Sequence, residues 1–302
     1  MRRSVPFKQN ALVVIAGAGP AGIATAIQLK HCSITPVIFE KGEPGGLLRN
    51  ANSVENYPGF PHKISGPQLA RIFCTQLRRS GVKIFSDEVL KVEYKNKRFL
   101  VKTAGRLIST RFLVVASGTE PRRLEDVEIS ESVDNRIFYE VIHLLHQSRK
   151  SIAIIGAGDA AFDYALNLAK KNNVIIFNRS IRVRSIPSLF MAISKARNIT
   201  YITGAIIKRI SKNSSGLRLL CQTESKVQGF QVSYLLVAIG RKPALGFLSK
   251  GLIENRKRLI ARGRLYFVGD VKNGHCRQTS IAIGDGIRAG LLIYQRLCRE
   301  EI

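Results

Sequence analysis

The sequence predicts an α/β protein of two domains, because the same succession of strand, glycine-rich loop, helix and strand occurs in it twice. The chain has 302 residues, which is more than a single domain usually contains. The first copy covers residues 12–40 and the second covers residues 152–179. No apolar stretch is long enough to cross a bilayer, so we expect no membrane span.

The first copy begins with an apolar strand at residues 12–16. Its loop consists of Gly17, Ala18, Gly19, Pro20, Ala21 and Gly22. We expect a helix from there to about Lys30, followed by a strand at residues 36–39 that ends at Glu40. Although Arg2 and Arg3 precede this apolar region, the glycines interrupt it, so it is not interpreted as a signal peptide.

The second copy repeats this order, with an apolar strand at residues 152–155. Its loop consists of Gly156, Ala157, Gly158, Asp159, Ala160 and Ala161. A helix is expected to about Lys171, and a strand at residues 174–177 is followed by Asn178 and Arg179.

The glycine spacing in both loops is typical of a Rossmann-like dinucleotide-binding fold. The first glycine allows the tight turn, the second allows the backbone to approach a pyrophosphate, and the small third residue allows the helix to pack on the strand. The pyrophosphate then binds the N–H groups at the helix N-terminus. Either loop alone is explained as well by an ordinary glycine-rich turn, but two copies in full context favour two dinucleotide sites.

The residue at the end of the second strand differs between the copies. At the same offset from the first glycine, Glu40 aligns with Arg179. An acid there binds ribose hydroxyls, whereas an arginine pairs with a 2′-phosphate. Arg184 lies close enough in the sequence to complete a phosphate clamp. The second copy therefore favours NADPH, with NADH as the open alternative.

The cysteine and charge content indicate a cytoplasmic protein that attracts acidic partners. Five scattered cysteines, with no Cys-x-x-Cys pair, predict reduced thiols. There are 48 Lys and Arg against 21 Asp and Glu, a formal net charge of +27. Such a field attracts acidic redox proteins, nucleic acid or anionic lipid, and a lineage bias toward basic surfaces explains it equally well. The aromatic content of 7% and the lack of a recognisable motif argue against a nucleic-acid partner.

Four further motifs lie outside the two loops. They are Gly45-Gly46-Leu47-Leu48 with Val54-Glu55-Asn56-Tyr57-Pro58-Gly59, Ala116-Ser117-Gly118, Val237-Ala238-Ile239-Gly240-Arg241-Lys242-Pro243, and Tyr266-Phe267-Val268-Gly269-Asp270 with Arg277-Gln278-Thr279. With these motifs the chain resembles, along nearly its whole length, the low-molecular-weight thioredoxin reductase group of the pyridine nucleotide-disulfide oxidoreductases.

The resemblance implies a discontinuous FAD domain of residues 1–118 and 245–302, with an NAD(P)H domain of residues 119–244 inserted into it. The crossings near Gly118 and Gly240 are then the hinge, and domain rotation about it is a hypothesis. The homodimer usual in this group is expected as well.

The resemblance also implies site residues. Asp270 is expected to bind the flavin ribityl chain, the N–H groups around Gln278 and Thr279 to face the flavin ring edge, and Tyr57 to lie beside the ring unless it is an ordinary packing aromatic. The full FAD set is Gly17, Gly19, Pro20, Ala21, Gly22, Glu40, Gly46, Leu47, Asn56, Tyr57, Ser117, Gly118, Gly269, Asp270, Arg277, Gln278 and Thr279. The NADPH set is Gly156, Gly158, Asp159, Ala160, Arg179 and Arg184.

Two departures from the resembled group bear on function. The stretch 136–156, where those enzymes carry a redox Cys-x-x-Cys, contains no cysteine. Their basic signature His-Arg-Arg-x-x-x-Arg is reduced here to Asn178, Arg179, Ser180 and Arg184. The missing dithiol argues against the reduction of thioredoxin by way of the chain's own cysteines.

The leading hypothesis is therefore an enzyme similar to the thioredoxin-reductase-like ferredoxin–NADP reductases. It passes electrons from NADPH through FAD to a ferredoxin- or flavodoxin-like acceptor, and no catalytic side chain is assigned. The alternatives are a disulfide reductase or dithiol oxidase that uses a partner's cysteines, with Cys276 as a candidate contact, an oxidase that uses O₂, and a non-enzymatic basic dinucleotide-binding protein. His143, His146 and His275 lack further ligands at metal-binding spacing, so no metal site is predicted.

Overall fold

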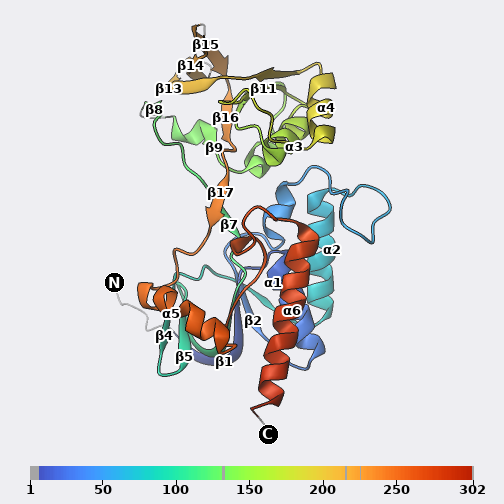
Figure 1. The fold of residues 1–302 in the computed structure, drawn as a ribbon, viewed down its shortest axis with the longest axis vertical. Coiled ribbons are helices and arrows are strands. Elements are labelled where there is room, and N and C mark those ends of the chain that lie inside the picture. Colours follow the sequence, from blue (N-terminus) through green and yellow to red (C-terminus); the bar gives the residue numbers. More distant parts are fainter. Residues whose placement is uncertain (1–6, 131–132, 215, 225, 301–302) are drawn as a thin grey trace. The chain divides into compact units, whose positions relative to one another are not determined.

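The computed structural model describes residues 7–130, 133–214, 216–224 and 226–300, and the chain divides into two compact units. Unit 1 comprises Met1–Arg49, Val54–Glu120 and Lys242–Ile302, and unit 2 comprises Asn50–Ser53 and Pro121–Arg241. The chain passes between the units at Arg49–Asn50, Ser53–Val54, Glu120–Pro121 and Arg241–Lys242. At the last two crossings the short strands β7 (Thr119–Pro121) and β17 (Arg241–Pro243) pair. Both units appear in Figure 1.

Unit 1 is built on a seven-stranded sheet of order β3-β2-β1-β6-β5-β4, with β18 also paired to β6. Its strands are β1 (Phe7–Ala16), β2 (Val37–Glu40), β3 (Ile84–Ser86), β4 (Lys91–Lys95), β5 (Arg98–Lys102), β6 (Arg106–Val115) and β18 (Leu265–Phe267). The pairs β1–β2, β1–β6, β2–β3 and β18–β6 are parallel. Val13, Val14 and Ile15 of β1 are fully buried, as in a parallel strand covered on both faces.

Helices cover this sheet. They are α1 (Pro20–His31), α2 (Gly66–Arg79), α5 (Lys250–Ala261) and α6 (Thr279–Cys298), with short 3₁₀ turns η1 (Gly46–Asn50) and η4 (Gly269–Val271). Helices α1, α2 and α6 lie side by side (Figure 1). On α5, Leu252 and Leu259 join the core cluster that contains Val14 and Phe39.

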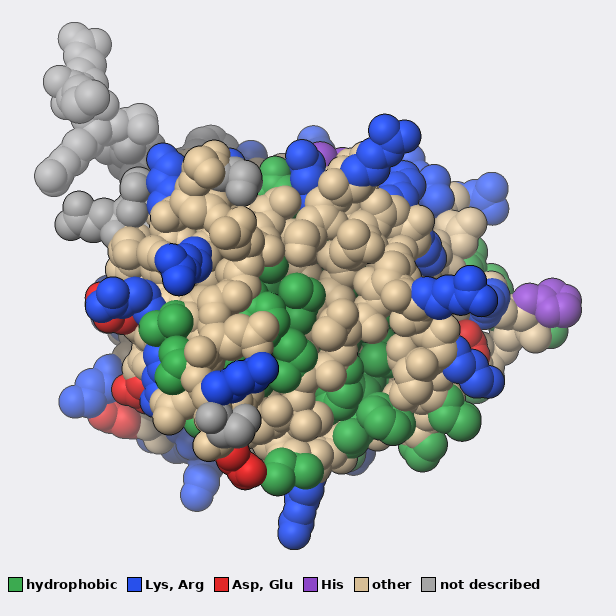
Figure 2. All heavy atoms as spheres, turned by 90° about the horizontal axis from the view of Figure 1, so that it is seen from above, with side chains coloured by type: hydrophobic (Ala, Val, Ile, Leu, Met, Phe, Trp, Pro, Cys, Tyr) green, Lys and Arg blue, Asp and Glu red, His purple; other side chains and the backbone are tan. Residues whose placement is uncertain are grey.

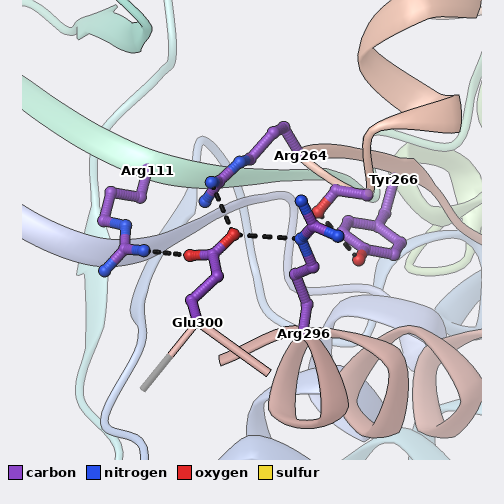
Figure 3. A network of polar contacts seen from close by, with 6 residues as sticks. Arg111, Arg264, Tyr266, Arg296 and Glu300 are labelled. Carbon is purple, nitrogen blue, oxygen red and sulfur yellow. Dashed lines mark hydrogen bonds and ion pairs between the residues drawn. The ribbon is translucent and has the colours of Figure 1, made fainter. Parts of the chain in front are cut away.

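The C-terminal end of α6 is fixed by a charged network (Figure 3). The Glu300 carboxylate accepts hydrogen bonds from Arg111, from Arg264 at 2.6 Å and from Arg296 Nε at 2.9 Å. Because Arg111 belongs to β6 and Arg264 precedes β18, one carboxylate ties the end of the helix to two sheet strands.

Unit 2 contains two sheets. The first is all parallel, of order β12-β11-β10-β16-β9, and the second has the order β15-β14-β13-β8. The elements are β8 (Glu128–Ile129), η2 (Asp134–Arg136), β9 (Ile137–Phe138), η3 (Val141–Leu144), β10 (Ser151–Ile155), α3 (Asp159–Leu168), β11 (Asn173–Phe177), α4 (Pro187–Lys195), β12 (Ile199–Ile202), β13 (Ile206–Lys212), β14 (Leu217–Gln222), β15 (Val227–Val232) and β16 (Tyr234–Val237). Helices α3 and α4 pack on the parallel sheet through Phe162 and Ile193.

The predicted α/β fold with two strand–loop–helix–strand copies is confirmed by β1-α1-β2 and β10-α3-β11. One helix is shorter than expected, because α3 ends at Leu168 and not near Lys171. The amide of Asn172 donates to Leu168 O at 3.0 Å and to Gln147 O at 3.0 Å, which replaces further helical hydrogen bonds. None of the helices in the described residues combines the length and the apolar character that a membrane crossing requires.

Candidate functional site

The glycine loop of unit 1 is packed too tightly for side chains at two positions. Gly17 has a φ of +107°, and a Cβ added there would lie 2.4 Å from the Ala116 carbonyl oxygen. A Cβ on Gly22 would lie 2.0 Å from Gly17 O. The Gly17 N–H donates to Phe39 O at 2.8 Å, which fixes the loop against the end of β2. These two glycines are therefore required by the turn itself.

Gly19 differs from these two glycines, because the space beside it is open. It is the N-cap of α1, just before Pro20, and no described side chain caps the helix there. A Cβ on Gly19 would meet no heavy atom of the described residues within 4 Å. An uncapped helix start with room beside Gly19 fits a pyrophosphate bound at a helix N-terminus. Ala21, by contrast, is buried against Gly269 and Gly286.

Glu40 lies at the edge of this loop, at the end of β2. Its half-buried carboxylate accepts hydrogen bonds from the Ala18 N–H at 2.7 Å and from the Gly42 N–H at 2.9 Å. The two N–H groups hold the acid in place beside the glycine loop, where an acid binds ribose hydroxyls in this fold.

The Gly45–Leu48 turn closes against the same loop. The Gly45 N–H donates to Ala18 O at 2.8 Å. Gly46 has a φ of +55°, and a Cβ on it would lie 3.1 Å from the Gly19 Cα. The predicted residue Gly46 therefore lies at Gly19, and Leu47 follows it in η1.

Two predicted residues that lie far apart in the sequence meet in unit 1. The Asn56 amide donates to Gln278 Oε1 at 2.9 Å, so the loop after η1 contacts the start of α6. Tyr57 packs on Phe60 and edge-on against Phe73 of α2, with ring centroids 6.0 and 5.7 Å apart. Tyr57 thus has a packing role, and its place beside a flavin stays a prediction.

Ser117 and Gly118 lie beside the returning chain. Ser117 Oγ donates to Ala244 O at 2.7 Å, and the Ala244 N–H donates to Gly118 O at 3.1 Å. Gly118 has a φ of +63° and no described heavy atom within 4 Å of an added Cβ. This leaves room beside Gly118, while Ser117 holds the return segment.

Gly269 and Asp270 lie in η4, which an unpredicted residue holds in place. Asp285 of α6 accepts hydrogen bonds from the Gly269 N–H at 3.1 Å and from Asn273 at 2.6 Å, and forms an ion pair with Lys272 at 2.7 Å. Burial opposes ionisation of Asp285, but these donors outweigh it and lower the pKa of the carboxyl. Its signal in the sequence was that Asp285 is the single acid of α6.

The start of α6 resembles the start of α1. Gln278 is its N-cap, and no described side chain caps the helix. Gln278 is exposed, whereas Arg277 and Thr279 are half-buried. Uncapped N–H groups at this end are suited to hold a partial negative charge, as the prediction for Gln278 and Thr279 requires.

The loop of unit 2 repeats the construction of unit 1. Gly156 has a φ of +128°, and a Cβ on it would lie 2.3 Å from Ala238 O. Gly158 caps α3 without a described side-chain bond, and an added Cβ there would meet no described heavy atom within 4 Å. Ala161, which is buried, takes the place of Gly22. The room at Gly158 fits a second pyrophosphate.

Asp159 and Ala160 are exposed at the start of α3. Asp159 Oδ1 accepts hydrogen bonds from Ser185 Oγ and from the Ile186 N–H, both at 2.8 Å. Asp159 therefore anchors the segment after β11, which carries Arg179 and Arg184.

The strand register corrects the predicted alignment of Glu40 with Arg179. Ala16 is paired with Phe39 in unit 1, and Ile155 with Phe177 in unit 2. The loop N–H bonds agree, since Gly17 N donates to Phe39 O and Gly156 N to Phe177 O. The α3–β11 connection is one residue shorter than its counterpart, so Asn178 and not Arg179 is the equivalent of Glu40.

Asn178 shapes the basic segment from this position. It is buried, accepts from the Ser180 N–H at 3.0 Å, and donates to Arg182 O at 3.2 Å and to the Tyr201 hydroxyl at 2.8 Å. From the sequence alone, Asn178 was recognised only as a position at which the His-Arg-Arg-x-x-x-Arg signature is lost. An amide here supports the loop without adding negative charge beside Arg179 and Arg184, which are both exposed.

Neither a metal site nor a disulfide is formed by the described residues. They contain no group of three or more His, Cys, Asp or Glu side chains that could hold a metal ion. All five cysteines are free thiols in the described chain.

A family model for the pyridine nucleotide-disulphide oxidoreductases matches residues 11–286, the region that contains both glycine loops and η4. The chain belongs to this family. It is 28% identical to the thioredoxin reductase of Borreliella burgdorferi, over 96% of this chain and 92% of that protein. It is 25% identical to the thioredoxin reductase of Chlamydia trachomatis, over 93% and 97%. The crystal structure of Lactococcus lactis thioredoxin reductase in its FR conformation shares the fold, with a TM-score of 0.84, 23% identity and coverage of 96% and 99%.

These similarities confirm the coarser predictions. The chain is a thioredoxin reductase-like flavoprotein oxidoreductase, and that family uses FAD and NADPH. The finer prediction of a ferredoxin- or flavodoxin-type acceptor has no counterpart in these relatives, which are all named thioredoxin reductases.

Proposed function

We propose that this chain is an NADPH-dependent flavoprotein reductase whose acceptor is a disulfide on a separate molecule. The observation that carries the proposal is the absence of any Cys-x-x-Cys pair in a family member of 302 residues. Without a Cys-x-x-Cys of its own, the chain has no internal dithiol relay, so the flavin passes its electrons directly to an external acceptor.

The cysteines that the chain does have support an external acceptor. Burial raises the pKa of the Cys221 thiol and, against the opposing charges of Arg49 and Arg78, that of the Cys74 thiol. Thiols with raised pKa values stay protonated near neutral pH and are poor nucleophiles. Cys276 is exposed and Cys298 is half-buried, but they are far apart in the sequence.

FAD and NADPH together supply hydride transfer and the release of electrons to an acceptor. Reduction of one disulfide to two thiols takes two electrons and two protons, which one NADPH and one proton from water supply. For this chemistry we assign FAD to unit 1, where Gly19 leaves room at the start of α1, and NADPH to unit 2, where Gly158 does so. Glu40 would hold the adenosine ribose of FAD, and Arg179 and Arg184 the 2′-phosphate of NADPH.

A second candidate acceptor is an acidic one-electron carrier of the ferredoxin or flavodoxin type. The net charge of +27 favours it, because opposite charge accelerates encounter. In the face shown in Figure 2, Lys and Arg side chains are spread over the surface and acidic ones are few. The charge does not select the acceptor by itself, because it would accelerate the encounter with an acidic disulfide protein equally.

The deciding experiment adds NADPH to the FAD-loaded protein without oxygen and follows the flavin absorbance. Oxidised thioredoxin, a small soluble disulfide, ferredoxin and flavodoxin are then offered one at a time. We expect rapid bleaching by NADPH and return of the colour with a disulfide. Cys276→Ser should react at the wild-type rate, because the acceptor supplies both sulfur atoms.

Return of the colour only with ferredoxin or flavodoxin would replace the disulfide by the second candidate. A flavin that NADPH does not bleach would overturn both.

A further inference from the structure

The Asn50–Ser53 segment belongs to unit 2, although the residues on both sides of it belong to unit 1. It lies within the loop that also carries Gly46, Leu47, Asn56 and Tyr57, which are assigned above to the flavin side. The chain therefore passes into unit 2 and back within four residues, at a place that the sequence motifs did not reveal.

Polar side chains of unit 2 bind this segment at its start. Asn50 is buried, and its amide donates to Glu140 Oε2 at 2.7 Å. The other carboxylate oxygen, Glu140 Oε1, accepts from Arg241 Nη1 at 2.8 Å. Tyr164 lies beside them, and burial together with the Glu140 charge raises its pKa to about 12, so it stays neutral.

A second set of contacts comes from α3. The Asn52 N–H donates to Asp163 Oδ2 at 2.8 Å, and Lys170 donates to Asn52 Oδ1. Burial raises the pKa of the Asp163 carboxyl, and the N–H groups of Asn52 and Ser53 offset only part of that effect. By accepting these backbone N–H groups, the Asp163 carboxyl holds the segment against α3.

Helix α3 thus carries two functions at neighbouring positions. Its N-terminus, with Gly158, Asp159 and Ala160, forms the proposed pyrophosphate site. Asp163 follows Asp159 by four residues, or about one helical turn. A change at the nucleotide loop that moves the start of α3 therefore moves the acceptor of the Asn52 N–H.

We propose that Asp163 and Glu140 are positioning residues that couple the nucleotide loop to the flavin-side loop through the Asn50–Ser53 segment. This inference rests on the proposed function, because it requires a nucleotide at Gly158 and a flavin beside Gly46. Coupling of this kind is reciprocal: the nucleotide affects the flavin environment, and FAD affects nucleotide affinity to the same degree.

The test measures binding, not turnover. NADP⁺ is titrated into FAD-loaded and FAD-free protein for the wild type, Asp163→Ala, Asp163→Asn and Asn50→Ala, with the flavin spectrum as one readout and NADP⁺ affinity as the other. Lys171→Ala is the matched control, since it alters a charge just beyond α3 outside both sites. Hydrogen exchange of residues 50–54 reports the contact directly in protein without cofactor.

We expect Asp163→Ala to lose more than half of the NADP⁺-induced change in the flavin spectrum. Its NADP⁺ affinity should fall at least five-fold with FAD bound and stay unchanged without FAD, and residues 50–54 should exchange faster. Asn50→Ala should act in the same direction. Asp163→Asn, which keeps an oxygen for the Asn52 N–H, and Lys171→Ala should resemble the wild type.

Equal losses of affinity with and without FAD in Asp163→Ala would reveal a merely structural role and overturn the coupling. A full spectral response in both Asp163→Ala and Asn50→Ala would overturn it as well, while leaving the proposed function intact. A wild type that binds neither FAD nor NADP⁺ would overturn the proposed function and the coupling together.

Discussion

Glycines in the two strand–loop–helix copies have two kinds of surroundings, tight at Gly17 and Gly156 and open at Gly19 and Gly158, where we propose that the cofactors bind. In the first pair an added Cβ would lie 2.4 or 2.3 Å from a carbonyl oxygen, whereas in the second pair it would meet no described heavy atom within 4 Å. This difference allows folding and binding to be tested independently.

Gly19→Ala should lower FAD affinity at least ten-fold while changing the free energy of unfolding by at most about 1 kcal/mol, the cost of a poorer N-cap. Gly17→Ala should destabilise the protein by more than about 2 kcal/mol, because its φ and its backbone contact are both unfavourable for alanine. FAD content and thermal unfolding of the two variants measure both effects. Normal FAD retention by Gly19→Ala would contradict the pyrophosphate assignment.

Gly158→Ala should weaken NADP⁺ binding at least ten-fold and leave FAD content unchanged, because the room beside Gly158 is assigned to the nucleotide of unit 2. Calorimetric titration with NADP⁺ measures the loss. An unchanged NADP⁺ affinity would remove that loop from the nucleotide site.

The partly buried carboxyl of Asp163 makes stability depend on pH. Burial raises the pKa of Asp163 in the folded chain above the unfolded value of about 3.9. The stability that the protonated carboxyl contributes is therefore fully present below about pH 3.9 and is lost as the pH rises through the folded pKa. Asp163→Asn stays uncharged, so its melting temperature relative to the wild type should increase between about pH 4 and pH 7. A difference that does not vary with pH would contradict this reasoning.

Helix α6 packs on α1 through glycine, and the two glycines in its first half differ in their surroundings. A Cβ on Gly286 would lie 2.3 Å from Ala21 O, whereas one on Gly284 would meet no described heavy atom within 4 Å. Gly286→Ala should therefore destabilise the protein by about 1–3 kcal/mol through overpacking. Gly284→Ala, the matched control, should stabilise it by about 0.5–1 kcal/mol through helix propensity. Chemical denaturation of both variants measures the difference, and equal effects would contradict the close helix contact.

Both strand–loop–helix–strand copies could be predicted because their signals are local: apolar strands, glycine spacing and a helix of about three turns. The equivalence of Asn178 with Glu40 was missed, because the α3–β11 connection is one residue shorter than the α1–β2 connection. A difference of one residue shifts the alignment of the two copies without changing their pattern of strands, glycines and helix. Asp285 and the Asn50–Ser53 segment were missed for another reason. Their partners come from other parts of the chain, as when Asn50 binds Glu140 at a separation of 90 residues.

The net charge of +27 is a property of the whole molecule and affects encounter rates. If the acceptor is acidic, the second-order rate of its reduction should fall several-fold between low and physiological ionic strength, because screening shortens the range of attraction. The rate with a small uncharged disulfide should not change. Stopped-flow measurements at several salt concentrations with both acceptors test this, and equal salt dependence would show that charge does not guide docking.

The division of the sheet in unit 1 has a consequence for synthesis. Strand β18 and helix α6 belong to Lys242–Ile302, whereas β1 to β6 belong to the first part of the chain. On the ribosome, all of Pro121–Arg241 emerges before β18 does, and the parallel β10–β16 core of unit 2 contains only strands from that stretch. Unit 2 can therefore fold while unit 1 still waits for β18 and α6, and the FAD proposed for unit 1 should bind only after these two elements have emerged.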